Sequence, residues 1–482
     1  MARPCELREC RPSPGYPGGH EIGEQMSDEH LERWEPIFPW IESQLGGKIV
    51  RRARQGRESG GRYAWFVDLE VDGQEVKTYV RGTRDDSFSY VKIYSTAREA
   101  KILDVLHKQG VPVPSVLAFH EDPQAAVLGH IVGEDNFNLV TDQSERDSIM
   151  EHFLEVLAQL HSVDISHFEN ADVTIPKSPE EVALNDLNVW QSTYEAGVRE
   201  PIPLLTFACQ WLRRNVPRKN VEPVLCQGDT GPGNLLFDKG RVTALVDFEL
   251  AHISDPMADI ACIRSRDLYT PVDRFAERLR RYSEISGREI DFDTLTFYNV
   301  KTQALVPMAL APVMENLHAG TEHAEWIAQH VFYLRTTAQS LAEATGVELE
   351  DVDLPAPRET RFSHYYDMLI ENLEEEQSPA IEDPFLKNRM WFSSRLARHL
   401  QHGDRLGVAF DDQELDDMGE LLGKRPVSVK EGHRAMHQLV LDSGPERDEA
   451  FVRYFYRHAK REEMLMEGAL GMCEGAELSP LR

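Results

Sequence analysis

A short glycine-rich stretch between two apolar runs constrains the fold of this chain more than any other feature. Residues 224–237 read VLCQGDTGPGNLLF. The apolar ends are typical of short buried strands, and the glycines and proline between them predict a tight loop. Asp229 and Asn234 lie on this loop, and Asp247 comes thirteen residues after Asn234, behind another apolar run. The pattern therefore predicts a small β-structured site that gathers two carboxylates and an amide.

The chain before this loop predicts a small antiparallel sheet with one helix. Strand-like runs occupy 49–55, 63–71 and 76–80, and the last two flank Asp72-Gly73, a strong hairpin signal. A helix is expected at about 97–109, with Thr96 and Glu99 as a capping box at its start. Two further strands follow, up to residue 132. The expected order is three strands, one helix and two strands.

From residue 133 onwards apolar residues recur mostly at helical spacing, so this part is expected to be helical around the small β-structured site. An acidic segment with two prolines, EDVDLPAPRET, predicts a linker. The expected organisation is a disordered tail at 1–27, a nucleotide-binding lobe at 28–132, a catalytic lobe at 133–349, the linker at 350–360 and an all-helical module at 361–482. Within that module we expect helices at 362–373, 383–401, 411–422, 430–442 and 446–470.

Charge and composition exclude several classes of protein. The chain has 482 residues and a formal net charge of −30, which repels phosphate backbones and argues against nucleic-acid binding. No apolar run approaches the roughly 20 residues that span a bilayer, and the first residues have no signal-peptide core. Six scattered cysteines without zinc spacing suit a reducing compartment. We therefore expect a cytoplasmic protein that has no membrane or nucleic-acid partner.

The three polar residues at the loop suit phosphoryl transfer. This reaction needs one carboxylate to orient the attacking hydroxyl and accept its proton, and oxygen ligands to hold Mg²⁺ against a triphosphate. Magnesium prefers hard oxygen ligands and keeps several waters, so one amide and one carboxylate are enough from the protein. Asp229 fits the first task, and Asn234 and Asp247 fit the second. Turns are rich in Asp and Asn, so the first two residues could be a coincidence. Asp247 is a third such residue and follows a predicted strand, which makes coincidence a poor explanation.

The same residues resemble a known family. QGDTGPGN and VDFELAHISDPMAD are similar to the catalytic loop and metal segment of the aminoglycoside phosphotransferase and choline kinase family, in which histidine stands where this chain has Gln227. The resemblance covers about 45–345 and is nearest to the branch found as the kinase portion of some acyl-CoA dehydrogenases. It implies an α+β, bilobal protein-kinase-like fold, here with an all-helical C-terminal extension, and it implies ATP and Mg²⁺ as cofactors.

Carried over onto matching positions, the resemblance assigns roles in the first lobe. Arg81, in KTYVRG, is the candidate phosphate-contacting cation, and Lys77 is the second candidate because strand alternation puts both on one face. Glu99 either pairs with that cation or turns back to cap its own helix. A hairpin at GRESGG occupies the position of the phosphate-covering turn, and its candidate nucleotide-contacting residues are Ser59, Gly60 and Gly61.

Four further positions are expected to support the site. Asp255 and Asp259 match the family's D-P-x-x-D carboxylates and are expected to brace the catalytic loop. Glu249 either braces the loop or meets a ligand. Gln227 is expected to replace the family histidine as a structural group, because its amide offers one acceptor and two donors and cannot titrate near neutral pH.

The function expected from the sequence is ATP-dependent phosphorylation of a small-molecule hydroxyl, with the branch resemblance favouring a hydroxyacyl-type metabolite. An aminoglycoside or choline-like cation is the alternative substrate, since the acidic surface suits a cation. The rival from another class is a pseudokinase or scaffold whose helical module binds a partner. Aromatic runs in that module are expected in its core, with a homodimer contact as the other reading.

Overall fold

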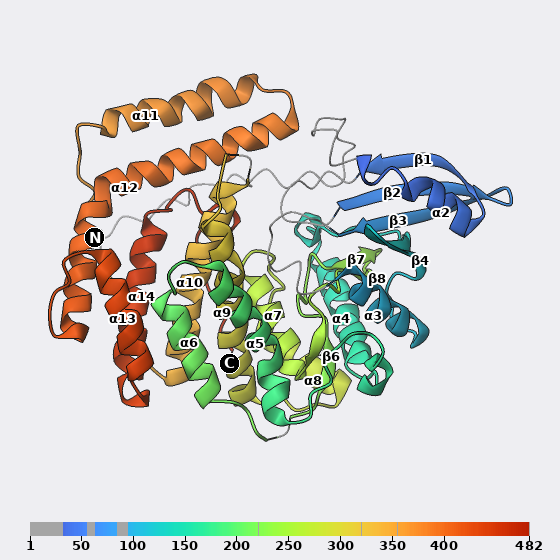
Figure 1. Ribbon diagram of the computed structural model, residues 1–482, viewed down its shortest axis with the longest axis horizontal. Helices are drawn as coiled ribbons and strands as arrows, with labels where there is room; N and C mark the ends of the chain where they lie inside the picture. Colours follow the sequence, from blue (N-terminus) through green and yellow to red (C-terminus); the bar gives the residue numbers. More distant parts are fainter. Residues whose placement is uncertain are drawn as a thin grey trace.

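The computed structural model describes residues 32–54, 63–83, 95–219, 221–319, 321–353 and 355–481. A small sheet lobe lies on one side of a set of central helices, and the C-terminal helices lie on the other side (Figure 1). Across the described residues, no helix combines the length and the apolar surface that a bilayer-spanning segment needs. The α+β class, with a sheet lobe, a helical lobe and a helical C-terminal region, is confirmed.

The sheet lobe is one antiparallel sheet of five strands in the order β1-β2-β3-β5-β4. Strand alternation gives it two apolar faces. Ala125 and Val127 of β5 pack in the core beneath α2, whereas Ala126 and Leu128 pack on the side of α3 and the helical lobe. The elements are α2 (Ile37–Leu45), β1 (Lys48–Arg54), β2 (Tyr63–Val71), β3 (Gln74–Gly82), α3 (Thr96–Lys108), β4 (Val116–Glu121) and β5 (Gln124–Gly129).

The helical lobe holds two short, two-stranded antiparallel sheets that carry the predicted site. β6 pairs with β9, and β7 pairs with β8. Helix α5 and strand β9 were not expected from the sequence. The helices are α4 (Gln143–Leu160), α5 (Pro179–Gly197), α6 (Pro203–Arg214), α7 (Pro256–Asp267), α8 (Phe275–Ser286), α9 (Phe292–Met314) and α10 (His323–Thr345), and the strands are β6 (Val224–Cys226), β7 (Leu235–Asp238), β8 (Arg241–Leu245) and β9 (His252–Ser254).

The C-terminal region is helical, but its longest helix corrects one expectation. Two helices at 383–401 and 411–422 were predicted. Gly403 and Gly407 lie between these ranges, and each glycine costs about 1 kcal/mol in a helix. The chain instead forms one helix across the whole span. Leu406 and Phe410 are buried on its inner face, and this packing outweighs the glycine cost. The helices are α11 (Ser363–Glu371), α12 (Pro384–Leu422), α13 (Val429–Asp442) and α14 (Asp448–Met464).

The C-terminal helices share a hydrophobic core with the helical lobe. The ring of Phe207 on α6 stacks on Phe455 of α14, with centroids 5.8 Å apart, and meets Phe451 edge-on at 5.5 Å. Met436 and Val440 of α13 belong to the same buried cluster. The domain boundary at 350–360 stays a prediction, and this core is the contact that a separate module would have to break.

This shared core makes a testable prediction. Phe455→Ala should lower the free energy of unfolding by about 3–5 kcal/mol, because it leaves a cavity between α6 and α14. Phe362→Ala is the matched control, since the Phe362 side chain is 43% exposed and its loss should cost far less. Urea denaturation of both variants measures the difference. Equal destabilisation would show that the Phe207–Phe455 contact does not hold the two regions together.

Candidate active site

The loop between β6 and β7 needs glycine at a defined position. Gly228 has φ of +85°, and a Cβ atom placed there would lie 2.3 Å from the carbonyl oxygen of Leu250. Only glycine allows this approach of two backbone segments without displacement. The loop therefore packs directly against the chain that follows β8, and this brings Asp229 and Asn234 to the same place as Asp247.

Asp229 and Asn234 interact directly across the loop. The side-chain amide nitrogen of Asn234 donates to the backbone carbonyl of Asp229 at 2.7 Å and to its carboxylate Oδ2 at 2.7 Å. The Asn234 side chain is buried, while the Asp229 carboxylate is 36% exposed and can meet a ligand. The loop thus presents one accessible carboxylate with an amide fixed beside it.

Asp247 follows β8 in an unusual backbone conformation. Its φ is +63°, a left-handed value that is uncommon for any residue other than glycine and that recurs at functional sites. The preceding N–H of Val246 donates to the carbonyl of Asn234 at 3.1 Å, which joins this segment to the loop. The Asp247 side chain is 30% exposed. The left-handed turn places its carboxylate beside the sheet lobe, where it meets Arg81.

Arg81, at the end of β3, is shared by three carboxylates. Its Nη2 donates to Asp247 Oδ1 at 2.7 Å and to Glu249 Oε2 at 3.0 Å, and its Nε lies 3.3 Å from Glu99 Oε2. Burial lowers the pKa of Arg81, but the charges of Asp247, Glu99 and Glu249 outweigh burial and hold the pKa well above its usual value. Lys77, the second candidate cation, instead lies 3.7 Å from the exposed Glu75.

The capping box predicted at Thr96 and Glu99 is wrong. Ser95 is the N-cap of α3, and its hydroxyl accepts the N–H of Arg98 at 3.2 Å. The carboxylate of Glu99 points away from its own helix end. Besides pairing with Arg81, it accepts the backbone N–H of Phe248 at 3.2 Å. Of the two readings of Glu99, the structure supports the pairing with the cation, because Ser95 already supplies the cap.

Arg98 is a buried residue of this site that the sequence reading missed. Its guanidinium donates to the backbone carbonyls of Asp172 at 3.2 Å, Glu249 at 3.4 Å and Ala251. It therefore fixes the segment after Asp247 against α3. Charged residues in the first turn of a helix are common and exposed, so nothing in the sequence marked this one as buried.

Gln227 joins the two ends of the loop through its side-chain amide. It is fully buried, and its amide Nε2 donates to the carbonyls of Asn234 at 3.1 Å and Val246 at 2.6 Å. Within the described part of the chain, its amide oxygen finds no donor. An imidazole has one N–H donor when neutral, so it could serve only one of these carbonyls.

Asp259 of α7 bonds the loop, whereas the carboxylate of Asp255, which was expected to brace it as well, caps the start of α7. The carboxylate of Asp259 accepts the N–H of Gln227 at 2.8 Å and of Gly228 at 3.0 Å, and it lies 3.1 Å from His161 Nε2. Burial raises the pKa of Asp259, but the hydrogen bond from His161 contributes to a net lowering. Asp255 caps α7 by accepting the N–H of Met257, and burial raises its pKa to about 6.

A second arginine, also missed, pairs with the candidate base. Arg266 Nε donates to Asp229 Oδ1 at 3.1 Å, and its Nη2 contacts Oδ2. The Arg266 side chain lies so close to the loop that a Cβ on Gly231 would be 3.2 Å from its Cβ, and one on Gly233 would be 3.1 Å from its Nη1. Asp259 and Arg266 are seven residues apart and so share a helix face, which is the sequence signal that could have found it.

The donor set fits a magnesium-bound triphosphate. Asn234 and Asp247 offer hard oxygen ligands, and Arg81 offers a planar fork that can bridge phosphate oxygens. In the structure Arg81 neutralises Asp247, so both residues would have to exchange partners to bind a nucleotide. Ser59, Gly60 and Gly61, the predicted phosphate-covering residues, lie outside the described residues.

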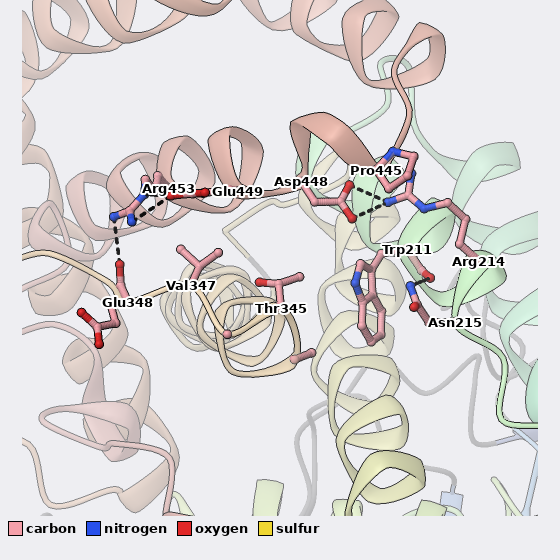
Figure 2. Close-up of a pocket in the computed structure, with 12 residues that line it drawn as sticks. Trp211, Arg214, Asn215, Thr345, Val347, Glu348, Pro445, Asp448, Glu449 and Arg453 are labelled. Atoms are coloured by element: carbon pink, nitrogen blue, oxygen red, sulfur yellow. Dashed lines mark hydrogen bonds and ion pairs between the residues drawn. The ribbon is translucent and has the colours of Figure 1, made fainter.

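A cavity elsewhere in the molecule is not lined by any of the predicted site residues. Its volume is about 810 Å³, and it lies among the ends of α6 and α10 and the start of α14. Figure 2 shows Arg214 of α6 paired with Asp448 across it, and Arg453 paired with Glu449 one turn away on α14. Both arginines are thus paired with carboxylates of α14.

Comparison with known proteins identifies the domain that holds these residues. Residues 71–296 match the model of the phosphotransferase enzyme family. This range includes every described residue of the predicted site. This part of the chain is a phosphotransferase-family domain. The range covers Arg81 of the sheet lobe as well as Asp259 and Arg266 of α7, so the family match and the geometric cluster coincide.

Two curated relatives and one solved structure illustrate the similarity. Human acyl-CoA dehydrogenase family member 11 is 28% identical over 195 residues, which are 38% of this chain and 25% of that protein. Aminoglycoside 3'-phosphotransferase of Streptomyces fradiae is 28% identical over 226 residues, 43% of this chain and 78% of that protein. Choline kinase LicA of Streptococcus pneumoniae superposes with a TM-score of 0.46 at 15% identity, covering 64% of this chain and 99% of LicA. The chain thus spans about a quarter of the acyl-CoA dehydrogenase relative.

The bonds of Gln227 predict how substitutions behave. Gln227→Leu should lower the free energy of unfolding by about 1–3 kcal/mol, because the carbonyl of Val246 loses its amide donor. Gln227→His keeps one donor and should change the phosphotransfer rate by less than about tenfold, or about 1.4 kcal/mol of barrier. Urea denaturation and rate measurements check the two. A His variant faster by several orders of magnitude would mark Gln227 as a sign of a degraded site.

Proposed function

We propose that this domain transfers the γ-phosphoryl group of ATP to the hydroxyl of a small molecule, with Mg²⁺ as cofactor. The observation that carries the proposal is the convergence of Asp229, Asn234 and Asp247. They come from two segments of the chain, the loop between β6 and β7 and the stretch after β8, and the Gln227 amide and the Val246 N–H connect these segments. A loop built only for a turn would not need Asp247 in a left-handed conformation beside an arginine of the other lobe.

Each residue then has a separate task. Asp229, the more exposed carboxylate, orients the acceptor hydroxyl and takes its proton. Asn234 and Asp247 would hold the magnesium ion, which neutralises charge on the phosphate oxygens. Arg81 turns from Asp247 to the phosphates, while Glu99 keeps its guanidinium at the end of β3. Arg98 and Asp259 hold the segments on either side, so the reacting groups stay in fixed positions.

The charge of Arg266 affects which acceptor molecules the site favours. A guanidinium in direct contact with Asp229 favours a neutral or anionic group near the hydroxyl and disfavours a cationic one. The net charge of −30 favours a cationic acceptor instead. Most of that charge is far from the site, and physiological salt largely screens charges that are more than ~8 Å apart. The local contact should dominate. We therefore favour a hydroxyacyl-type acceptor, as the similarity to acyl-CoA dehydrogenase family members also suggests.

A cationic acceptor such as an aminoglycoside is the alternative substrate, and the similarity to the Streptomyces fradiae phosphotransferase supports it. A pseudokinase or scaffold is the alternative from another class. In its favour, both key carboxylates are paired with arginines in this structure and Gln227 stands in place of histidine. Against it, the complete set of Asp229, Asn234 and Asp247 is retained in a connected geometry, which a binding module does not need.

Two substitutions test the proposal. Asp229→Asn should reduce phosphotransfer at least about a hundredfold, because the hydroxyl loses its proton acceptor. Asp247→Asn should abolish it, because the strongest magnesium ligand is lost. The control is Asp238→Asn on β7, whose side chain is 52% exposed and should leave turnover unchanged. ADP formation and the mass of the phosphorylated product are measured with hydroxyacyl and aminoglycoside acceptors.

The outcomes separate the hypotheses. Wild-type turnover by Asp247→Asn at limiting magnesium would remove the metal assignment. A wild-type protein that neither binds magnesium-ATP nor slowly hydrolyses it would establish the pseudokinase reading. Turnover of an aminoglycoside in preference to hydroxyacyl compounds would keep the kinase but reverse the argument from Arg266.

A further inference from the structure

Three helices of the C-terminal region bring two imidazoles and a carboxylate together. The Oε1 atom of Glu414 on α12 lies 3.4 Å from Nε2 of His433 on α13 and 3.1 Å from Nδ1 of His458 on α14. All three donor atoms lie within 4.8 Å of one another. The residues are far apart in the sequence and none belongs to the kinase site, so the phosphotransferase proposal does not explain the cluster.

The two distances from Glu414 match the edge of a tetrahedral metal site. Zinc binds imidazole nitrogen and carboxylate oxygen at about 2.0–2.2 Å, which puts neighbouring ligands about 3.3 Å apart. The contacts of 3.4 Å and 3.1 Å lie close to this value without any backbone movement. Two imidazoles and one carboxylate form a donor set that suits zinc and the neighbouring transition metals rather than magnesium or calcium.

The neighbours of Glu414 hold it in place for such a role. Its second oxygen, Oε2, contacts Nη2 of Arg461, which also donates to Asp417 at 2.8 Å. The hydroxyl of Tyr454 donates to Oε1 at 2.5 Å. Carboxylates that bind metals are commonly held by such outer hydrogen bonds. The orientation of Oε1 towards both histidines is therefore fixed by groups that need not move.

Space and charge for an ion are also present. A cavity of about 40 Å³ adjoins the cluster, lined by Glu414 and His458 together with Asp411, Arg461, Glu462 and four other residues. This volume accommodates a metal-bound water, for which about 10–15 Å³ is enough. Six of the ten residues at 411–420 are acidic. Arg425 pairs with Asp412 and Asp416, and Arg461 pairs with Glu414 and Asp417, so the added negative charge beside the cluster comes mainly from Asp411, which lines the cavity. The side chains of His433 and His458 are 31% and 17% exposed, so an ion can reach them.

We propose that Glu414, His433 and His458 bind one divalent transition-metal ion of the zinc class, with a water in the fourth position facing the cavity. The ion ties α12, α13 and α14 together. Because α13 and α14 pack on α6 of the helical lobe, this site stabilises the contact between the C-terminal region and the kinase domain. The competing occupant is a proton on one of the histidines, which would hold the same contacts without a metal.

The test uses the full-length protein, freed of metal by a chelator and titrated with Co²⁺ and then Zn²⁺. The wild type should bind one equivalent of Co²⁺ with visible ligand-field absorption, which Zn²⁺ displaces, and Zn²⁺ should raise the Tm. His433→Ala should lose the absorption and weaken Zn²⁺ binding more than a hundredfold. The matched control is His437→Ala on the same helix, since His437 contacts Thr206 instead, and it should bind as the wild type does.

A second measurement keeps the test decisive if the His433 variant fails to fold. X-ray absorption at the zinc edge of the wild-type protein should report two imidazoles and oxygen ligands. No stoichiometric binding, or equal binding by His433→Ala, would overturn the site and leave the proton as its occupant. A strong sulfur-to-cobalt charge-transfer band would also overturn it, because the metal would then be held by cysteines, of which this cluster has none.

Discussion

The guanidinium of Arg81 is the interaction on which the arrangement of the site depends. It joins a strand of the sheet lobe to Glu99 of α3 and to Asp247 and Glu249 behind β8. Asp247 and Glu249 would repel each other strongly in this partly buried place without a cation between them. Removing one partner of a buried ion pair typically costs about 3–5 kcal/mol, so the lobes are held together by a charge that the phosphates of a nucleotide would later share.

Arg266 repeats this arrangement on the other side of the site. It pairs with Asp229 as Arg81 pairs with Asp247, so each proposed working carboxylate is neutralised in the resting protein. This resting state avoids free carboxylates in a chain that is already strongly acidic. It also means that binding of substrates exchanges ion pairs instead of creating them. We infer that affinity and rate depend on how readily the two arginines change partners.

The sequence predicted the parts of the site that lie on continuous motifs. Asp229, Asn234 and Asp247 could be found because turn chemistry and strand patterns mark their positions, and Gln227 because the family motif drew attention to it. Arg98 could not be found in this way, and for Arg266 the sequence offers only its shared helix face with Asp259, which does not show that it reaches Asp229. Their contacts join Arg98 to Ala251 and Arg266 to Asp229, across 153 and 37 positions, and local propensity contains no information on such distances.

The failures in the fold have the same origin. The predicted break in α12 and the predicted capping box at Thr96 both agree with local sequence rules. Burial of Leu406 and Phe410 kept α12 continuous, and Ser95 took the capping position in place of Thr96. The domain boundaries and the homodimer contact stay predictions, because they concern separability and association. The shared core of α6 and α14 shows why a linker composition alone does not settle where a folding unit ends.

The most direct test of the central claim is the affinity for ATP with and without magnesium, in the wild type and in Asp247→Asn. Without metal, the Asp247 carboxylate faces the triphosphate as a like charge and keeps Arg81 occupied. The variant should then bind ATP more tightly than the wild type. With magnesium the same carboxylate becomes a ligand, and the variant should bind more weakly. Isothermal titration calorimetry measures all four values. A change in the same direction under both conditions would contradict the account.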